Sequence, residues 1–363
     1  MTPTPARLRA MRFAAQGISG TAPDPEAAVG RMLAVQGQDL GQALWAVGVR
    51  THGATLATVR DAFDRGALVR SWPMRGTLHV VRPDDLRLLL ALTAGRTLRS
   101  TARRADALGI DAAVVARARD VTVSALAGGP GLVRDDLSTV WRRAGIDPGG
   151  GRGSHLLLHL AQEGLVAWGP TARVGQRLVL LDEWAPPATA PSATTPDERD
   201  EALRRVLLGY LRGRGPAPAT DAAAWTKLPL GDVRRARAAA GAAVEDLGDG
   251  LLALADRPAV GGVPAGHLLP GFDEYLLGYA DRSAQLDPEH AARVVPGGNG
   301  VFLPMAVVRG RVVGTWSRTE RAAGVSVTVT PFTPLDAAAT RALDAAATRF
   351  GTFLGVPVAS AAR

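Results

Sequence analysis

The chain has 363 residues, 47% hydrophobic and 21% charged, which is enough for two or three globular domains with a sizeable core. It contains no cysteine, which excludes disulfides, thiol nucleophiles and cysteine-ligated metal sites. The chain has no apolar run of membrane-spanning length, and its first residues lack the apolar core of a signal peptide. We therefore expect a cytoplasmic protein with no membrane segment.

The net charge of +8 is concentrated near the N-terminus, with +7 in residues 1–110, zero in 111–185 and +1 in 186–363. A basic region of this kind fits a polyanion such as DNA. A biased genome is the alternative, because every basic residue except Lys227 is arginine. That bias explains the choice of Arg over Lys, but it does not explain why the excess lies in one third of the chain.

Three stretches predict helices followed by β-prone runs, which is typical of winged-helix units. In the first unit, 1–110, we expect helices over 5–16, 25–36, 40–49 and 55–65 and strands over 68–72 and 77–81. In the second, 111–185, we expect helices over 112–126, 132–144 and 155–163 and strands over 165–168 and 177–181. After a Pro/Ser/Thr linker at 186–197, the third unit, 198–265, predicts helices over 198–211, 220–225 and 230–240 and a strand over 251–254.

The C-terminal region, 266–363, is richer in strands. It predicts a hairpin of 301–308 and 311–317 around Gly310, a strand over 325–330 and a closing helix over 335–350. The expected fold is therefore α+β, with three tandem winged-helix (helix-turn-helix) units and a C-terminal β-rich element.

Two glutamines follow the apolar face of the second predicted helix. Apolar residues within 29–33 share one helical face, and the next position on that face is Gln36. Gly37 makes a break in the helix easy, and in an extended turn Gln36 and Gln38 would point to the same side. Buried amides need hydrogen-bond partners, so this pair is where we first look for chemistry.

Other catalytic motifs are absent or incomplete. Lys227 lacks the preceding glycine of a phosphate-binding loop, and no nucleophile elbow occurs. His155 and His159 have the spacing of two zinc ligands, but the catalytic Glu and a third ligand are missing. The glycine-rich run 149–153 is best interpreted as a flexible loop, in which Arg152 is a candidate phosphate contact. We expect neither a cofactor nor a metal.

The first predicted strand pair carries Arg70, Trp72, Arg75 and His79 around its turn. Two interpretations stay open for these residues. They form a purely structural wing, or they face DNA with arginines on phosphates or in the minor groove.

Two C-terminal motifs also allow two interpretations each. Asp273 and Glu274 lie among apolar and aromatic residues, and buried acids need partners. They serve either as structural ion pairs that join domains or as active-site acids. The candidate cations are Arg282, Arg309, Arg311 and Arg318.

The tip that contains Asn299, Val301 and Phe302 is the second of these motifs. It is either an ordinary turn or an apolar wedge that pushes between DNA base steps.

Together these motifs resemble the winged-helix DNA glycosylases of the AlkZ and YcaQ type. The residues that carry the resemblance are 36–38, 74–79, 269–275, 299–304 and 313–316. The resemblance implies a C-shaped arrangement around duplex DNA and release of bulky N7-alkylated guanine. It also implies unhooking of interstrand crosslinks, in DNA repair or in self-resistance to a DNA-alkylating natural product. Gln36 and Gln38 match the family's catalytic positions, whereas Gly37 departs from the usual apolar residue between them.

A glutamine pair is sufficient for this substrate because N7-alkylated guanine is cationic and leaves as a neutral base without protonation. Positioning of water and electrostatic stabilisation then remain. We expect Gln38 to hold the water and Gln36 to fix the sugar–phosphate geometry. Asp39 is the second choice as base, since it is well placed to cap the helix at Leu40. Without a nearby lysine nucleophile, the expected enzyme is a monofunctional glycosylase.

Two other classes of function remain open at this point. A winged-helix regulator would bind DNA without catalysis, and a sequestering protein would grip alkylated DNA or the free drug without cleaving it. The glutamine pair discriminates, because a regulator does not need it. The expected partner is double-stranded DNA with alkylated guanine, in a nucleoid-associated protein that we expect to be a monomer.

Overall fold

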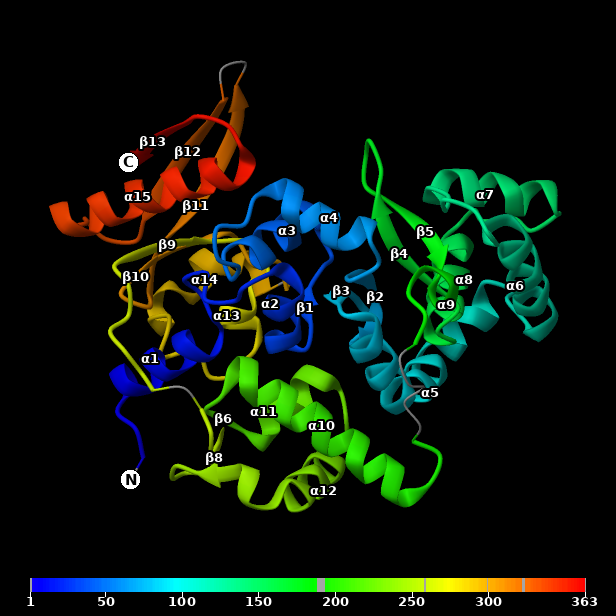
Figure 1. Ribbon diagram of the computed structural model, residues 1–363, viewed down its shortest axis with the longest axis horizontal. Coiled ribbons are helices and arrows are strands. Elements are labelled where there is room, and N and C mark those ends of the chain that lie inside the picture. Colours follow the sequence, from blue (N-terminus) through cyan, green and yellow to red (C-terminus); the bar gives the residue numbers. More distant parts are fainter. Residues whose placement is uncertain (1, 188–192, 258, 299, 322–323, 363) are drawn as a thin grey trace.

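The computed structural model describes residues 2–187, 193–257, 259–298, 300–321 and 324–362 (Figure 1). It confirms the mixed α+β fold that the sequence predicts, with helix-then-hairpin segments followed by a strand-rich C-terminal element. In the described ranges, no helix is long and apolar enough to cross a membrane.

The first unit contains the predicted helices and strands, with two differences. Its elements are α1 (Pro5–Ala15), α2 (Pro25–Met32), β1 (Val35–Gln36), α3 (Leu40–Gly48), α4 (Leu56–Asp64), β2 (Val69–Met74), β3 (Thr77–Val81) and α5 (Pro83–Ala107). The helix predicted to reach residue 36 ends at Met32, because Leu33 adopts a positive φ of 59°. Gln36 therefore lies on a strand and not on a helix face. The long helix α5 was not predicted, although Pro83 and two acidic residues open it in the usual way.

The wing of the second unit joins the wing of the first. The elements of the second unit are α6 (Ala112–Leu126), α7 (Arg134–Arg143), α8 (Arg152–Gln162), β4 (Val166–Thr171), β5 (Gln176–Leu180) and α9 (Leu181–Trp184). Strand β2 pairs with β4 at Arg70 and Trp168, which gives one sheet of order β1-β3-β2-β4-β5. The two units thus share a continuous five-stranded sheet, and the glutamine strand β1 is at one of its edges.

The third unit is the smallest and packs its long helix against the first unit. Its elements are α10 (Pro196–Arg214), β6 (Ala217–Pro218), α11 (Ala219–Thr226), α12 (Leu230–Ala240), β7 (Val244–Asp246) and β8 (Leu251–Leu254). The Thr195 side chain accepts from the Glu198 amide, and the Glu198 carboxylate accepts from the Thr195 amide, a capping box that starts α10. The three short strands form a sheet of order β6-β8-β7.

The C-terminal element is a second five-stranded sheet covered by one helix. Its elements are β9 (Gly266–Leu269), α13 (Glu274–Leu277), α14 (Ala291–Val294), β10 (Met305–Val308), β11 (Arg311–Arg321), β12 (Gly324–Pro331), α15 (Ala337–Leu354) and β13 (Val358–Ala362). The predicted hairpin is confirmed, since Arg309 and Gly310 both take positive φ values in a tight turn. The sequence predicted that its first strand begins at Val301, whereas the strand begins at Met305.

A buried ion pair connects this C-terminal element to the first unit. Asp273 accepts two hydrogen bonds from the Arg50 guanidinium, at 2.8 and 2.9 Å, and both side chains are almost fully buried. Arg50 also donates to the carbonyl of Ala46 and to the side-chain oxygen of Gln16. The interpretation of Asp273 as a structural acid is therefore supported, and its partner comes from the first unit.

Replacing Asp273 with alanine should strongly destabilise the protein, because Arg50 would stay buried without a counter-charge. Loss of one partner of a buried pair typically costs about 3–5 kcal/mol. Urea denaturation followed by circular dichroism should show a loss in the free energy of unfolding of this order.

The matched control is Asp61→Ala, which removes the exposed partner of Arg65. Exposed pairs contribute about 0–1 kcal/mol. Equal losses for the two variants would contradict a special role for the buried pair.

Candidate active site

Gln36 and Gln38 lie together at the edge of the shared sheet. Gln36 is on β1, opposite His79 on β3, and is 7% exposed, whereas Gln38 is exposed. The Gln36 side-chain oxygen accepts from the Gln38 amide at 3.1 Å, and the Gln38 side-chain oxygen accepts from the Leu78 amide at 3.3 Å. Neither Nε2 has a partner among the described residues. Two oriented amide donors are thus available at one place.

Gly37 allows the chain between the glutamines to run close to β3. A Cβ at this position would lie 3.1 Å from the carbonyl carbon of His79 and from the amide nitrogen of Val80. The Gly37 amide donates to Leu78, and the Gly37 carbonyl accepts from the Arg70 guanidinium at 3.0 Å. The backbone of the glutamine turn is therefore fixed on both sides.

Asp39 acts as the N-cap of α3. Its carboxylate accepts from the Gln42 amide at 3.0 Å, which confirms the capping role expected from the sequence. The residue is exposed and lies next to Gln38 in the chain.

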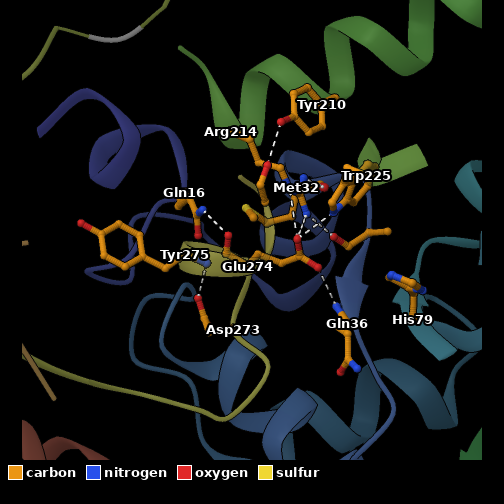
Figure 2. Close-up of polar contacts among 12 residues, drawn as sticks. Gln16, Met32, Gln36, His79, Tyr210, Arg214, Trp225, Asp273, Glu274 and Tyr275 are labelled. Carbon is orange, nitrogen blue, oxygen red and sulfur yellow. Dashed lines mark hydrogen bonds and ion pairs between the residues drawn. The ribbon is translucent and has the colours of Figure 1, made fainter. Parts of the chain in front are cut away.

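Glu274 holds the glutamine strand through the backbone amide of Gln36 (Figure 2). Its Oε1 accepts from the Gln36 amide at 3.1 Å, and its Oε2 accepts from the Trp225 indole at 2.8 Å. Arg214 forms an ion pair with Glu274 at 2.7 Å, with both side chains fully buried. Arg214 and Arg75 lower the pKa of Glu274 to about 2 against the opposing effect of burial, so the carboxylate is ionised. Figure 2 shows the Gln36 side chain directed away from this carboxylate.

Arg214 also holds the backbone next to the glutamine strand. Its guanidinium donates to the carbonyls of Met32 at 2.7 Å and Ala34 at 2.9 Å. The segment between α2 and β1 is thus held by an arginine from the third unit and a glutamate from the C-terminal element.

The partners of Asp273 and Glu274 are Arg50 and Arg214, neither of which the sequence pattern identified. Among the described residues, none of the four expected cations pairs with these acids, which corrects the prediction made for Arg282, Arg309, Arg311 and Arg318.

His79 and Arg75 face the third unit. His79 is fully buried, its Nδ1 donates to the Thr77 carbonyl, and its Nε2 accepts from Arg75 at 2.9 Å. Burial, together with the Arg75 cation, lowers the pKa of His79 to about 3, so the ring is neutral. Both residues approach the Trp225 ring. The structure supports the structural wing for these two residues, and buried His79 cannot face DNA.

The remaining wing residues and Arg152 also contact protein groups. Arg70 lies over the Trp168 ring and is held at Gly37, and Trp72 packs edge-on against Trp168. Arg152, at the start of α8, donates to the carbonyls of Leu108, Gly109 and Asp147. These bonds occupy donors of Arg70 and Arg152, which were candidate phosphate contacts.

Of the two interpretations left open for the tip at Val301 and Phe302, the burial of Phe302 favours the ordinary turn. Phe302 is 7% exposed and packs in the C-terminal core, with Arg282 over its ring, while Val301 is 41% exposed. Asn299 lies outside the described residues.

A more exposed apolar residue is at the tip of the β4–β5 hairpin, which sequence reasoning missed. Val174 is 77% exposed and follows exposed Arg173. Close to its turn, the hairpin is anchored to the first unit, because the Thr171 amide and hydroxyl both donate to Asp64. Figure 1 shows this hairpin extending beyond α4, on the side away from α5.

Some of the arginines that make the N-terminal third basic are buried, and others are exposed at the surface. Arg12 and Arg50 are buried, whereas the C-terminal half of α5 carries exposed arginines at positions 96, 99, 103 and 104. Spacings of three and four residues place several of them on one helix face, as a phosphate-binding surface requires. In the described part of the chain no cluster of three potential metal ligands occurs, and His159 instead contacts Glu163.

Comparison with known proteins identifies the family of this chain. The family model described as DNA glycosylase AlkZ-like matches residues 29–353. A relative named "Interstrand DNA cross-link repair glycosylase" from Streptomyces sahachiroi is 29% identical over 366 positions, covering 93% of this chain and 92% of the relative.

The solved structure of Streptomyces sahachiroi DNA glycosylase AlkZ superposes with a TM-score of 0.80 at 26% identity, covering 99% of this chain and 100% of that one. The family match supports an enzyme over the non-catalytic regulator that the sequence left open. The chain belongs to the AlkZ-like family of DNA glycosylases.

Proposed function

We propose that this glycosylase hydrolyses the N-glycosidic bond of bulky N7-alkylated guanine in duplex DNA, with Gln36 and Gln38 as catalytic residues. The observation that carries the proposal is the fixed glutamine pair. Each side-chain oxygen is held by a backbone amide, which leaves each Nε2 as an oriented donor. A site of this kind supplies orientation and polarity but no strong base.

The substrate compensates for the missing base. N7-alkylated guanine carries a positive charge and departs as a neutral base, while charge develops on the deoxyribose. Catalysis then consists of placing water and stabilising the sugar cation. Exposed Gln38 suits the water, because its oxygen keeps a second lone pair, and buried Gln36 suits the sugar–phosphate geometry.

The biological role that we propose is repair of such adducts or self-resistance to a DNA-alkylating natural product, including unhooking of interstrand crosslinks. The support is the similarity to the Streptomyces sahachiroi relative, which is named as an interstrand crosslink repair glycosylase. The proposed partner is double-stranded DNA with alkylated guanine, bound by a monomer, since the tandem units would supply several DNA-binding surfaces in one chain.

The Gln38→Ala variant should lose base release by at least about tenfold, since a pre-oriented polar group at a developing charge is worth this much or more. Abasic sites formed from a duplex with a single N7-alkylguanine measure the rate. Binding to the same duplex should stay near the wild-type level.

The Asp39→Asn variant is the matched control, because asparagine also caps helices well. It should retain most of the activity. If Asp39→Asn abolished turnover while Gln38→Ala did not, the catalytic assignment would be reversed. Binding without release from several N7 adducts would instead favour a sequestering protein.

We further propose that Val174 is the apolar wedge, in place of buried Phe302. Val174→Ser should reduce unstacking next to the lesion and slow base release on the order of tenfold, because apolar wedges supply part of the unstacking energy. Fluorescence of 2-aminopurine beside the adduct reports unstacking. The control is Val123→Ser, at a half-exposed valine on α6. Equal effects of the two substitutions would exclude the wedge.

The neutral state of His79 is also part of this proposal, since an imidazolium beside Arg75 would disturb the turn opposite Gln36. The pKa of His79 is about 3 when folded and about 6.5 when unfolded. The resulting stability is fully present above pH 6.5 and is lost as the pH falls towards 3.

His79→Gln should therefore show a shallower decline in unfolding free energy between pH 6.5 and 4, by about 1.4 kcal/mol per pH unit at most. Urea midpoints at several pH values measure the slope. His52→Gln, at an exposed histidine, is the control, and an unchanged slope in His79→Gln would contradict the buried neutral ring.

A further inference from the structure

Three arginines surround a small cavity where the first and third units meet. The cavity has a volume of about 300 Å³ and lies beside the C-terminal end of α2. None of its described lining residues is acidic, and they are Thr21, Ala22, Pro23, Ala27, Gly30, Arg31, Arg82 and Arg212. None of these residues belongs to the glutamine site.

Two of these arginines are held near each other without a counter-charge. Arg31 is half-buried and donates weakly to the Ala15 carbonyl at 3.5 Å, and Arg212 is exposed on α10. Neither forms an ion pair among the described residues. Burial and the neighbouring Arg212 cation lower the pKa of Arg31, as expected for like charges kept close together.

The third arginine, Arg82, lies against α2 at Gly30, where there is no side chain in its way. A Cβ at Gly30 would lie 2.9 Å from both Cζ and Nη1 of Arg82, so glycine lets this guanidinium lie flat against the helix. Arg82 pairs through Nε with Asp85 at 2.6 Å. The other nearby acids, Asp84 and Glu26, pair with Arg87 and Arg65 respectively. The nearby carboxylates thus pair with other arginines, except that of Asp85, which pairs with Nε of Arg82.

We propose that this three-arginine cavity binds a phosphoryl group. Guanidinium groups match phosphate oxygens in geometry and charge, and several of them suit an anion with more than one negative charge. Because Arg31 and Arg82 come from the first unit and Arg212 from the third, a bound phosphoryl group bridges the two units. Its source is either the DNA backbone or a free phosphate ester, and the two are separable by experiment.

The first measurement is thermal unfolding of the full chain at rising inorganic phosphate and constant ionic strength. The wild-type Tm should rise saturably, as for any ligand of the native state. The double variant Arg31→Gln, Arg212→Gln should lose at least about tenfold in phosphate affinity. Its urea midpoint without phosphate should not fall, because the substitutions remove like charges. Arg341→Gln, at an exposed arginine of α15 that pairs with no described residue, is the control.

The second measurement is the salt dependence of binding to undamaged duplex DNA. If the backbone is the ligand, the slope of log K against log salt should drop by about 0.9 for each lost contact. A lost phosphate response with an unchanged slope would assign the cavity to a free phosphate ester. An unchanged salt slope is required for the proposal to be overturned, together with one of two thermal results. Either phosphate leaves the wild-type Tm unchanged, or the rise in Tm persists in the double variant.

Only the DNA measurement rests on the proposed function. Gln38→Ala should keep the phosphate response whether or not it loses base release. Failure of the glycosylase proposal and failure of the phosphate site are therefore distinguishable.

Discussion

The ion pair between Glu274 and Arg214 is the constraint on which the site depends. Both side chains are fully buried, and such a pair is tolerable only when its remaining donors and acceptors are satisfied. The backbone around the glutamine strand satisfies them, through the carbonyls of Met32 and Ala34 and the amide of Gln36. The chain cannot continue α2 through this segment, because a helix would use these backbone groups internally. The price of burying two charges is thus offset by the same bonds that fix the glutamine turn.

This arrangement explains why the third unit and the C-terminal element matter to a site formed by the first unit. Arg214 is at the end of α10, and Glu274 is at the start of α13. Three distant parts of the chain meet at one short strand, so its position is defined by long-range contacts. A pair of neutral amides has little intrinsic catalytic power, and its effect depends on how well it is held. With Gln36 and Gln38 as the proposed catalytic residues, a rigid backbone would take the place of a strong acid or base.

Much of the fold could be predicted from the sequence, because it depends on local signals. The period of the apolar residues, the helix-capping residues and the glycines and prolines that end helices located most helices. They also located the hairpin at Gly310, where a positive φ suits a glycine. The end of α2 could not be predicted, since Leu33 is a good helix former, and the residue from the third unit that bonds the carbonyls on both sides of it, Arg214, is distant in the sequence. Likewise, the motif marked Asp273 and Glu274 as buried acids, but nothing local in the sequence identifies Arg50 and Arg214 as their respective partners. Which partner a buried charge finds is a property of the tertiary structure.

The same distinction applies to charge and exposed apolar residues. The number of arginines indicated a basic N-terminal third, yet Arg12 and Arg50 are buried and bond to groups in the protein interior. Arg70 and Arg75 bond to Gly37 and His79 of the first unit. Only residues that the fold leaves in solvent, such as those late in α5, contribute to a surface for DNA. A glycine-rich tip drew attention to Phe302, whereas the fold buries that ring and exposes Val174 on a hairpin anchored by Asp64. A wedge must be both apolar and rigidly supported, and only the second property requires knowledge of what lies beneath it. For the proposed wedge, the contacts that hold the hairpin close to its turn therefore matter as much as the residue at its tip.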